Sequence, residues 1–158
     1  MTEFSHLNKK GLPAMVNVSE KKISKRTATA TSIVCIPMEV LEKLNNDEMQ
    51  TKKGSVFQTA IIAGIMAAKK TGELIPLCHP LGLQNCTINI YINRQNEVVI
   101  DCTASIEAKT GVEMEALVGA SVAALTVYDM CKSLSHDIVI KETKLIQKTG
   151  GKRDFKRT

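Results

Sequence analysis

Two stretches of this sequence, VFQTAIIAGIMAA at residues 56–68 and ALVGASVAALTVY at residues 116–128, carry no charged side chain. Each spans 13 residues, fewer than the roughly 20 that a membrane-spanning helix needs. Small and apolar residues occupy most of the circumference of the helix that each stretch predicts, whereas a surface helix keeps a polar face. We therefore expect both helices to be buried on several sides, with subunits packed against one another. A helix layer covered by a sheet alone is the alternative.

Local signals predict where these two helices begin and end. Ser55 followed by Gln58 fits a capping box, in which the serine side chain caps the helix start. The first helix is expected to run to about Lys70 and to stop at Thr71-Gly72. The second helix is expected at about residues 112–134.

Alternating side chains predict strands before, between and after the two helices. The predicted strands are residues 23–36, a hairpin of residues 86–93 and 98–104, and residues 137–148. A short helix is expected from Pro37 through Leu44, and residues 150–154 are flexible by composition. This mixed order predicts an α+β fold, an antiparallel sheet packed on apolar helices of the ferredoxin-like type, in an oligomeric protein.

Length and composition narrow the class of protein. The 158 residues are expected to form one domain, residues 1–158. Hydrophobic side chains make up 44% and charged ones 23%, which excludes a mainly disordered chain. Five cysteines, an odd number without a CxxC pair, indicate reduced thiols, and no signal peptide is recognised. We expect a cytoplasmic protein without a membrane partner.

The net charge of +5 is unevenly distributed along the chain. Residues 1–26 carry a net charge of +4, residues 27–140 carry −4 and residues 141–158 carry +5. Basic ends could close over an anionic ligand, but they equally suit two solvated tails. Aromatic residues make up only 3% of the chain, which is a poor platform for stacking bases, so no nucleic-acid partner is expected.

Two prolines frame Leu77, Cys78 and His79 in an apolar loop at residues 74–81. Proline fixes the backbone and excludes a regular helix there. A histidine held on such a loop is positioned for chemistry, although a core histidine bonded to the backbone is the commoner case. Neither a metal site nor a thiol–base dyad is expected from the adjacent thiol and imidazole.

Charged side chains near the helix ends form further candidate sites. Glu113 and Glu115 lie at a helix start, where the macrodipole favours negative charge by roughly 0.3–1 kcal/mol, and charge complementarity alone explains them. Asp129 and Lys132 share a helix face. They could act as a proton-transfer pair or as an exposed ion pair worth about 0.3–0.5 kcal/mol, and both readings stay open. Residues 52–54, Lys-Lys-Gly, are a plausible phosphate-binding element before the first helix.

Taken together, these stretches resemble the family of cyclic pyranopterin monophosphate synthases, the molybdenum cofactor biosynthesis protein C family. They recur in family order and spacing over nearly the whole chain, a combination that is specific although each part is weak. The matching segments are Met15-Val16, Lys53-Gly54, residues 62–69, residues 74–81, residues 110–117, residues 123–126, residues 128–132, and Lys148 with Gly150-Gly151-Lys152.

The resemblance implies an enzyme, a lyase that takes a small molecule as its substrate. The family converts 3′,8-cyclised dihydro-GTP into cyclic pyranopterin monophosphate and releases pyrophosphate. It forms homohexamers, as trimers of dimers, with active sites at subunit interfaces. No cofactor is implied, and whether Mg²⁺ accompanies the triphosphate is left open.

The resemblance also assigns roles to residues of this chain. The implied catalytic residues are Asp129, Lys53, Lys132 and Lys148. The implied substrate-binding residues are Leu77, Cys78, His79, Glu113, Met114, Glu115, Arg26 and Lys152, and no metal ligand is implied.

The sequence departs from the family pattern at three places. Asn17 follows Met15-Val16 where the family has aspartate, Ser55 follows Lys53-Gly54 where aspartate or asparagine is frequent, and residues 153–154 read Arg-Asp where the family has Ser-Gly. Asn17 motivates an alternative, a catalytically inactive homologue that binds a pterin or nucleotide. A nucleic-acid-binding protein is a third reading, motivated by the basic ends.

Overall fold

The central sheet determines how the rest of the chain is arranged in the computed structural model, which describes residues 6–45, 48–51 and 54–157. Its strands pair antiparallel in the order β5-β6-β1-β7-β8. The elements, in chain order, are β1 (Ser24–Cys35), α1 (Met38–Leu41), β2 (Leu44–Asn45), β3 (Glu48–Thr51), β4 (Gly54–Ser55), α2 (Val56–Lys69), α3 (Thr71–Leu74), β5 (Asn85–Ile92), β6 (Glu97–Ala108), α4 (Glu113–Cys131), β7 (Val139–Thr149) and β8 (Phe155–Lys156).

Strand β1 lies in the middle of this sheet. It pairs with β6 along its whole length, from Ser24 opposite Ala108 to Cys35 opposite Glu97, and with β7 on its other edge. Helix α2 connects β1 to β5, and α4 connects β6 to β7, so the main elements follow the order βαββαβ of the ferredoxin-like motif. The predicted α+β fold is confirmed.

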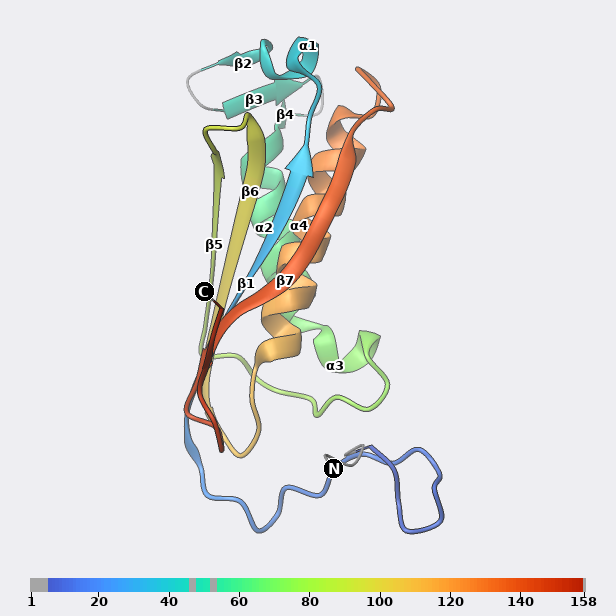
Figure 1. Ribbon diagram of the computed structural model, residues 1–158, viewed down its shortest axis with the longest axis vertical. Coiled ribbons are helices and arrows are strands. Elements are labelled where there is room, and N and C mark those ends of the chain that lie inside the picture. The colour runs from blue at the N-terminus through green and yellow to red at the C-terminus, as the bar shows by residue number, and fades with distance from the viewer. Residues whose placement is uncertain (1–5, 46–47, 52–53, 158) are drawn as a thin grey trace.

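Helices α2 and α4 lie side by side against one face of the sheet (Figure 1). Small residues on both layers allow the close packing, since alanines on β1 and α4 such as Ala30 and Ala120 are fully buried. The two helices lie close together at Gly64 and Gly119. A Cβ atom on Gly64 would lie 2.7 Å from the Gly119 carbonyl oxygen, a distance at which one of the helices would have to move.

The opposite face of this helix pair is apolar and uncovered in a single chain. Ile62, Met66 and Leu125 are 60%, 54% and 56% exposed. Helix α4 is long and apolar enough to cross a membrane by length and composition, and half of it is buried within the fold. The sheet therefore covers only one side of each helix.

The ends of the predicted helices differ from the structure in three places, one of which is the end of α4 at Cys131 instead of at about residue 134. Ser55 caps α2 as predicted, and its side chain accepts a hydrogen bond from the Gln58 backbone N–H. Helix α2 ends near Lys70 as expected. The helical backbone does not stop at Thr71, however, because a second short helix begins there. The Thr71 hydroxyl donates to the Ala68 carbonyl, and the chain continues into α3. The helix after Pro37 ends earlier than predicted, because residue 44 already belongs to β2.

The C-terminal segment, expected to be flexible, forms a hairpin with β7. Gly150 has a φ of +83°, which glycine adopts without strain. Its N–H donates to Oδ1 of Asp154 over 3.0 Å, and Ser24 Oγ donates to its carbonyl over 2.8 Å. Strand β8 then pairs with β7, with Phe155 opposite Lys148. The turn brings Lys152 to the end of the sheet where β1 begins.

Candidate functional site

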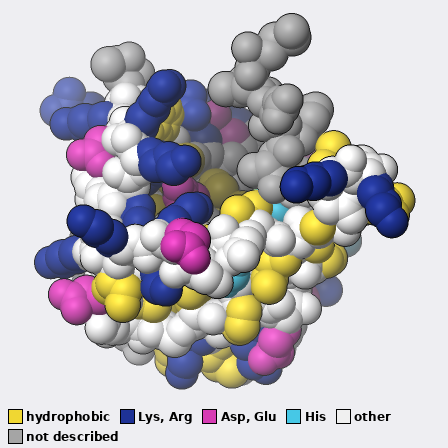
Figure 2. Space-filling model, turned by 90° about the horizontal axis from the view of Figure 1, so that it is seen from below, with side chains coloured by type: hydrophobic (Ala, Val, Ile, Leu, Met, Phe, Trp, Pro, Cys, Tyr) yellow, Lys and Arg dark blue, Asp and Glu magenta, His cyan; other side chains and the backbone are white. Residues whose placement is uncertain are grey.

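Two adjoining cavities lie at one end of the sheet, where β1 begins, β6 and β7 end and α4 starts. Their volumes are about 220 Å³ and about 390 Å³. They share residues 110–111, Lys21, Glu113 and Lys148. Figure 2 views this end of the molecule and shows Lys and Arg side chains gathered on one side of it, with apolar side chains beside them. We call the smaller one the basic cavity and the larger one the second cavity.

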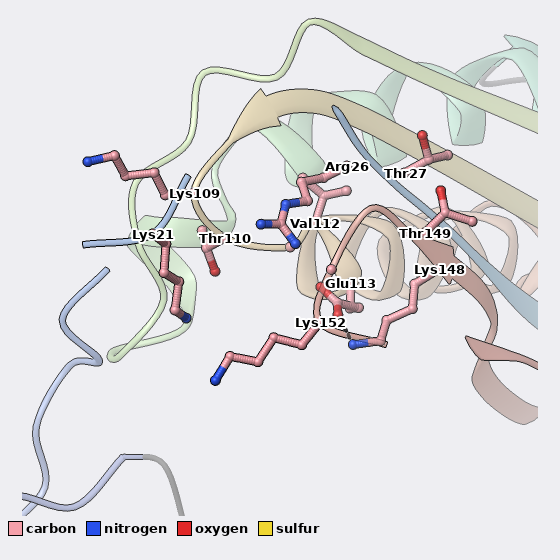
Figure 3. Close-up of a pocket in the computed structure, with 12 residues that line it drawn as sticks. Lys21, Arg26, Thr27, Lys109, Thr110, Val112, Glu113, Lys148, Thr149 and Lys152 are labelled. Carbon is pink, nitrogen blue, oxygen red and sulfur yellow. Dashed lines mark hydrogen bonds and ion pairs between the residues drawn. The ribbon is translucent and has the colours of Figure 1, made fainter. Parts of the chain in front are cut away.

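The basic cavity is lined by positive side chains from segments far apart in the sequence. They are Lys21, Arg26, Lys109, Lys148 and Lys152. Figure 3 shows the side chains of Arg26, Lys148 and Lys152 around one open space. Three of the residues implied by the family resemblance thus meet here, from β1, β7 and the turn before β8. Such a cluster can bind several anionic oxygens at once, because each charge-assisted hydrogen bond contributes roughly 1.5–3 kcal/mol.

Glu113 is the one acidic side chain among the residues that line the basic cavity. Lys148 Nζ lies 2.8 Å from Glu113 Oε1, and the two side chains are 34% and 29% exposed. Arg26 Nε donates to the Ala108 carbonyl at 3.4 Å, which orients the guanidinium from the edge of β6. The ion pair keeps Lys148 in place, but a polyanion would have to compete with Glu113 for it.

The second cavity collects five further residues to which the family resemblance assigns substrate binding. The loop before β5 contributes Leu77, Cys78 and His79, and the start of α4 contributes Met114 and Glu115. Valine and leucine side chains line the same cavity. Half of its lining residues are polar or charged, and this mixture of apolar contacts and hydrogen-bonding groups suits a planar heterocycle.

Glu115 places a carboxyl group in this cavity under strong desolvation. The residue is only 3% exposed. Burial, and to a smaller extent the charge of Glu113, raises its pKa above the usual range of a glutamate, whereas a hydrogen bond from its own N–H opposes the shift. Among the residues that the structure describes, no basic side chain forms an ion pair with Glu115. Its carboxyl group is therefore suited to holding or exchanging a proton with a ligand.

His79 and Cys78 have different surroundings although they are neighbours. His79 Nε2 lies 2.8 Å from the Val16 carbonyl oxygen, so the histidine is bonded to the backbone and also lines the second cavity. Burial, followed by the charge of Glu115, raises the pKa of the Cys78 thiol. The thiol keeps its proton near neutral pH, which disfavours a nucleophilic thiolate.

Asp129 and Lys132 lie away from both cavities. Lys132 Nζ is 2.7 Å from Asp129 Oδ1, and the two side chains are 51% and 56% exposed. Hydrogen bonding to Asp129 raises the pKa of Lys132. Asp129 follows Glu113 by 16 residues on the same helix, and at 1.5 Å per residue the two are separated by about 24 Å. One chain thus places this pair at the opposite end of α4.

Lys53 lies outside the described residues. The described residues next to it, Gly54 and Ser55, lead directly into α2. In Figure 1, β4 and the start of α2 lie at the same end of the molecule as the end of α4. The predicted site residues of the described chain thus divide into two groups: one around the cavities, the other near the end of α4.

The three departures from the family pattern leave the local structure intact. Asn17 Oδ1 accepts a hydrogen bond from the Ser19 N–H at 2.9 Å, a bond that an aspartate oxygen would accept equally. Asn17 itself is exposed and lines neither cavity. Ser55 caps α2, and Asp154 closes the turn before β8.

The structure adds two lysines that the sequence reasoning missed. Lys21 lines both cavities and Lys109 lines the basic one. Lys21 belongs to a segment without regular secondary structure, so no periodicity pointed to it. Within residues 6–45, 48–51 and 54–157, no three His, Cys, Asp or Glu side chains gather as a set that could hold a metal ion.

Known proteins are similar to this chain over most of its length. A relative from Dictyostelium discoideum, "Molybdenum cofactor biosynthesis protein 1", is 53% identical in an alignment of 167 positions that covers 95% of this chain and 26% of that protein. The "Molybdenum cofactor biosynthesis bifunctional protein" of Synechocystis is 51% identical over 159 residues, 98% of this chain and 46% of that protein. The chain thus spans about a quarter and just under half of the lengths of these two relatives.

A third relative matches this chain over almost the full length of both. The "Cyclic pyranopterin monophosphate synthase" of Xanthomonas campestris pv. campestris is 52% identical over 152 residues, which cover 96% of this chain and 92% of that protein. The family model described as "MoaC family" matches residues 15–151, which include both cavities except for His6 and Lys152. This chain belongs to the MoaC family.

Proposed function

We propose that this chain is a cyclic pyranopterin monophosphate synthase of molybdenum cofactor biosynthesis. Its substrate is 3′,8-cyclised dihydro-GTP, and its products are cyclic pyranopterin monophosphate and pyrophosphate. The basic cavity opening beside a carboxyl-lined second cavity is the observation that carries the proposal. It offers separate places for a triphosphate and for a guanine-derived ring, within a family whose members carry this name.

The basic cavity suits both binding and phosphate chemistry. A cyclic phosphate forms when a hydroxyl oxygen of the substrate attacks the innermost phosphorus and the bond to the departing pyrophosphate breaks. Negative charge then grows on the leaving oxygen. Arg26, Lys148 and Lys152 line the cavity and can stabilise that charge, and such electrostatic stabilisation is usually the largest single contribution to catalysis.

The second cavity suits recognition and proton transfer at the ring. The carboxyl group of Glu115 can accept hydrogen bonds from the ring N–H and amino groups of a guanine-derived heterocycle. Its raised pKa brings protonation closer to neutral pH, where a general acid or base works best. His79, which the Val16 carbonyl orients, lines the same cavity.

We infer that a second copy of the chain completes the site, in a homohexamer built as a trimer of dimers. The apolar outer face of α2 and α4, with Ile62, Met66 and Leu125 exposed, supports association. The separation of about 24 Å between Asp129 and Glu113 along α4 supports a shared site, because proton transfer to a ligand in the cavities requires direct contact. Asp129, Lys132 and Lys53 would then be supplied by the neighbouring subunit.

The proposal also covers the location, the partners and the cofactor requirement of the protein. A cytoplasmic location suits the five cysteines, none of which forms a disulfide. The small-molecule substrate is the partner proposed here besides further copies of the chain, with neither nucleic acid nor membrane involved. No cofactor is proposed, and Mg²⁺ would enter only with the triphosphate.

The test is an assay of pyrophosphate release from 3′,8-cyclised dihydro-GTP. The wild type is expected to turn over. Lys148→Ala, Lys53→Ala and Asp129→Asn are each expected to lose roughly a hundredfold or more in kcat, the usual effect of removing a group that moves protons or stabilises charge. No turnover by the wild type, or full turnover by these variants, would contradict the proposal.

An inactive homologue is the second candidate, motivated by Asn17. It predicts tight ligand binding without turnover, and restoration of activity by Asn17→Asp. Because Asn17 is exposed and its amide oxygen makes the turn that a carboxylate would make, we expect Asn17→Asp to change turnover less than about threefold.

A further inference from the structure

We propose that Lys21 is a substrate-binding residue, held over the basic cavity by a strap of residues 16–21, with Lys109 as the positioning residue of that strap. The inference deepens the proposed function and rests on it, since it assigns Lys21 to the triphosphate of the same substrate. The strap precedes β1 and belongs to no helix or strand. Its place in the structure is fixed by contacts with segments distant in sequence.

Two side chains from the body of the protein bond to backbone carbonyls of the strap. His79 Nε2 lies 2.8 Å from the Val16 carbonyl oxygen, and Lys109 Nζ donates to the Ser19 carbonyl over 2.7 Å. These contacts join residues 63 and 90 positions apart, so they locate the strap against the loop before β5 and against the end of β6. The strap is therefore attached at two points, one on each side of Asn17.

Turns within the strap then fix the direction of residue 21. The Ser19 N–H donates to Asn17 Oδ1 over 2.9 Å, and the Lys21 N–H donates to the Val18 carbonyl over 3.1 Å. A lysine side chain has several rotatable bonds, and a fixed backbone reduces the entropy that binding must overcome. The contacts thus favour a lysine that is ready for a ligand.

Lys21 and Lys109 play different parts although both line the basic cavity. In Figure 3 the Lys21 amine lies on the side of the cavity toward Lys152, whereas the Lys109 amine points away from that group. The Lys109 amine is bonded to the strap at Ser19. Lys21 therefore contacts the ligand, and Lys109 acts through the strap.

The charges in the basic cavity favour Lys21 as a ligand for an anion. Lys148 is paired with Glu113, which neutralises part of its attraction for an anion. Among the ion pairs of the described chain, none involves Lys21. Lys21 also borders both cavities, so it lies where the two parts of a ligand that fills both would meet.

The test compares Lys21→Ala with Lys22→Ala, its exposed neighbour, which lines neither cavity. Two readouts are used: the Kd of inorganic tripolyphosphate by calorimetry, and KM and kcat for pyrophosphate release. Lys21→Ala is expected to weaken tripolyphosphate binding and raise KM roughly tenfold or more, as the loss of one charged hydrogen bond predicts. Lys22→Ala should stay within about twofold of the wild type.

The two readouts separate the inference from the proposed function. Equal Kd values for the Lys21→Ala and Lys22→Ala variants, or no tripolyphosphate binding by the wild type, would overturn the inference even if the enzyme turns over. If Lys21→Ala weakens tripolyphosphate binding while the wild type shows no turnover, Lys21 stands as a polyphosphate ligand and the proposed function fails.

Coupling between the two lysines tests the positioning role. Lys109→Met removes the bond to Ser19 and is expected to weaken tripolyphosphate binding. The double variant should then bind no more weakly than Lys21→Ala alone, because the strap has nothing left to position. Additive losses would mean that Lys109 contacts the anion independently, which would contradict the role assigned to it.

Discussion

Glu115 shows how a single buried carboxyl group links stability to pH. Its side chain is 3% exposed, and burial is the largest cause of its raised pKa. A raised pKa means that the folded state binds more protons than the unfolded state between the two pKa values. Stability therefore falls as pH rises from the ordinary glutamate value through the folded value, and remains lower above it. The loss of stability arises at a residue that lines the second cavity.

The first prediction concerns Glu115→Gln, which keeps the shape of the side chain and removes its charge. The variant is expected to be more stable than the wild type at pH 8, with the difference vanishing near pH 4, because only the ionised form is penalised by burial. Thermal unfolding at both pH values measures this. A variant that is less stable than the wild type at pH 8 would show that the carboxylate is compensated in the folded state. Turnover should fall in the same variant, since an amide cannot exchange a proton.

Lys21 is a site residue that the sequence alone did not predict. The family resemblance brought out Arg26, Lys148 and Lys152, and the structure brings these three together. Contacts of the strap with His79 and Lys109 help to hold Lys21 in the same place, and such contacts between residues 63 and 90 positions apart leave no local pattern.

At the scale of elements, the close approach of α2 and α4 depends on glycine. A Cβ on Gly64 would clash with Ile88 Cδ1 and would lie 2.7 Å from the Gly119 carbonyl oxygen. The isoleucine side chain can rotate, but the carbonyl oxygen belongs to the helix backbone. Residue 64 therefore sets the distance between the two helices, and through them the packing of both against the sheet.

The second prediction is that Gly64→Ala destabilises the fold by roughly 1–3 kcal/mol, the cost of overpacking a core. Helix propensity alone predicts the opposite, because alanine is favoured over glycine by about 1 kcal/mol inside a helix. The sign of the change in the free energy of unfolding, measured with urea, therefore distinguishes overpacking from helix propensity. An increase in the free energy of unfolding would show that the helices separate at little cost.

Sequence patterns predicted the long elements well and the short ones poorly. The charge-free stretches and the alternating strands are long enough for the spacing of their apolar residues to indicate the type of element. The structure has α2, α4, β1 and the hairpin of β5 and β6 at these places. Helix α3 and strand β8 comprise four and two residues. They depend on a buried Thr71 and on the turn at Gly150, which are tertiary contacts rather than local preferences.

At the scale of the whole molecule, α4 separates the two halves of the proposed active site. Its start lines the cavities with Glu113 and Glu115, and its end carries Asp129 and Lys132 about 24 Å away. The sequence could place all four on one helix, and that helix is long enough to keep the pairs apart. What the sequence could not supply is the position of a neighbouring chain. A second copy in antiparallel contact would bring one subunit's pair to the other's cavities.

Mixing two inactive variants tests this shared site most directly. Lys148→Ala removes a residue of the cavities and Asp129→Asn one at the far end of α4, so each alone should release almost no pyrophosphate from 3′,8-cyclised dihydro-GTP. After subunit exchange, half of the dimers combine both variants and each of these regains one intact site, so the mixture is expected to recover up to about a quarter of wild-type turnover. No recovery in a mixture whose subunits have exchanged, beside a wild type that turns over, would contradict a site divided between two chains.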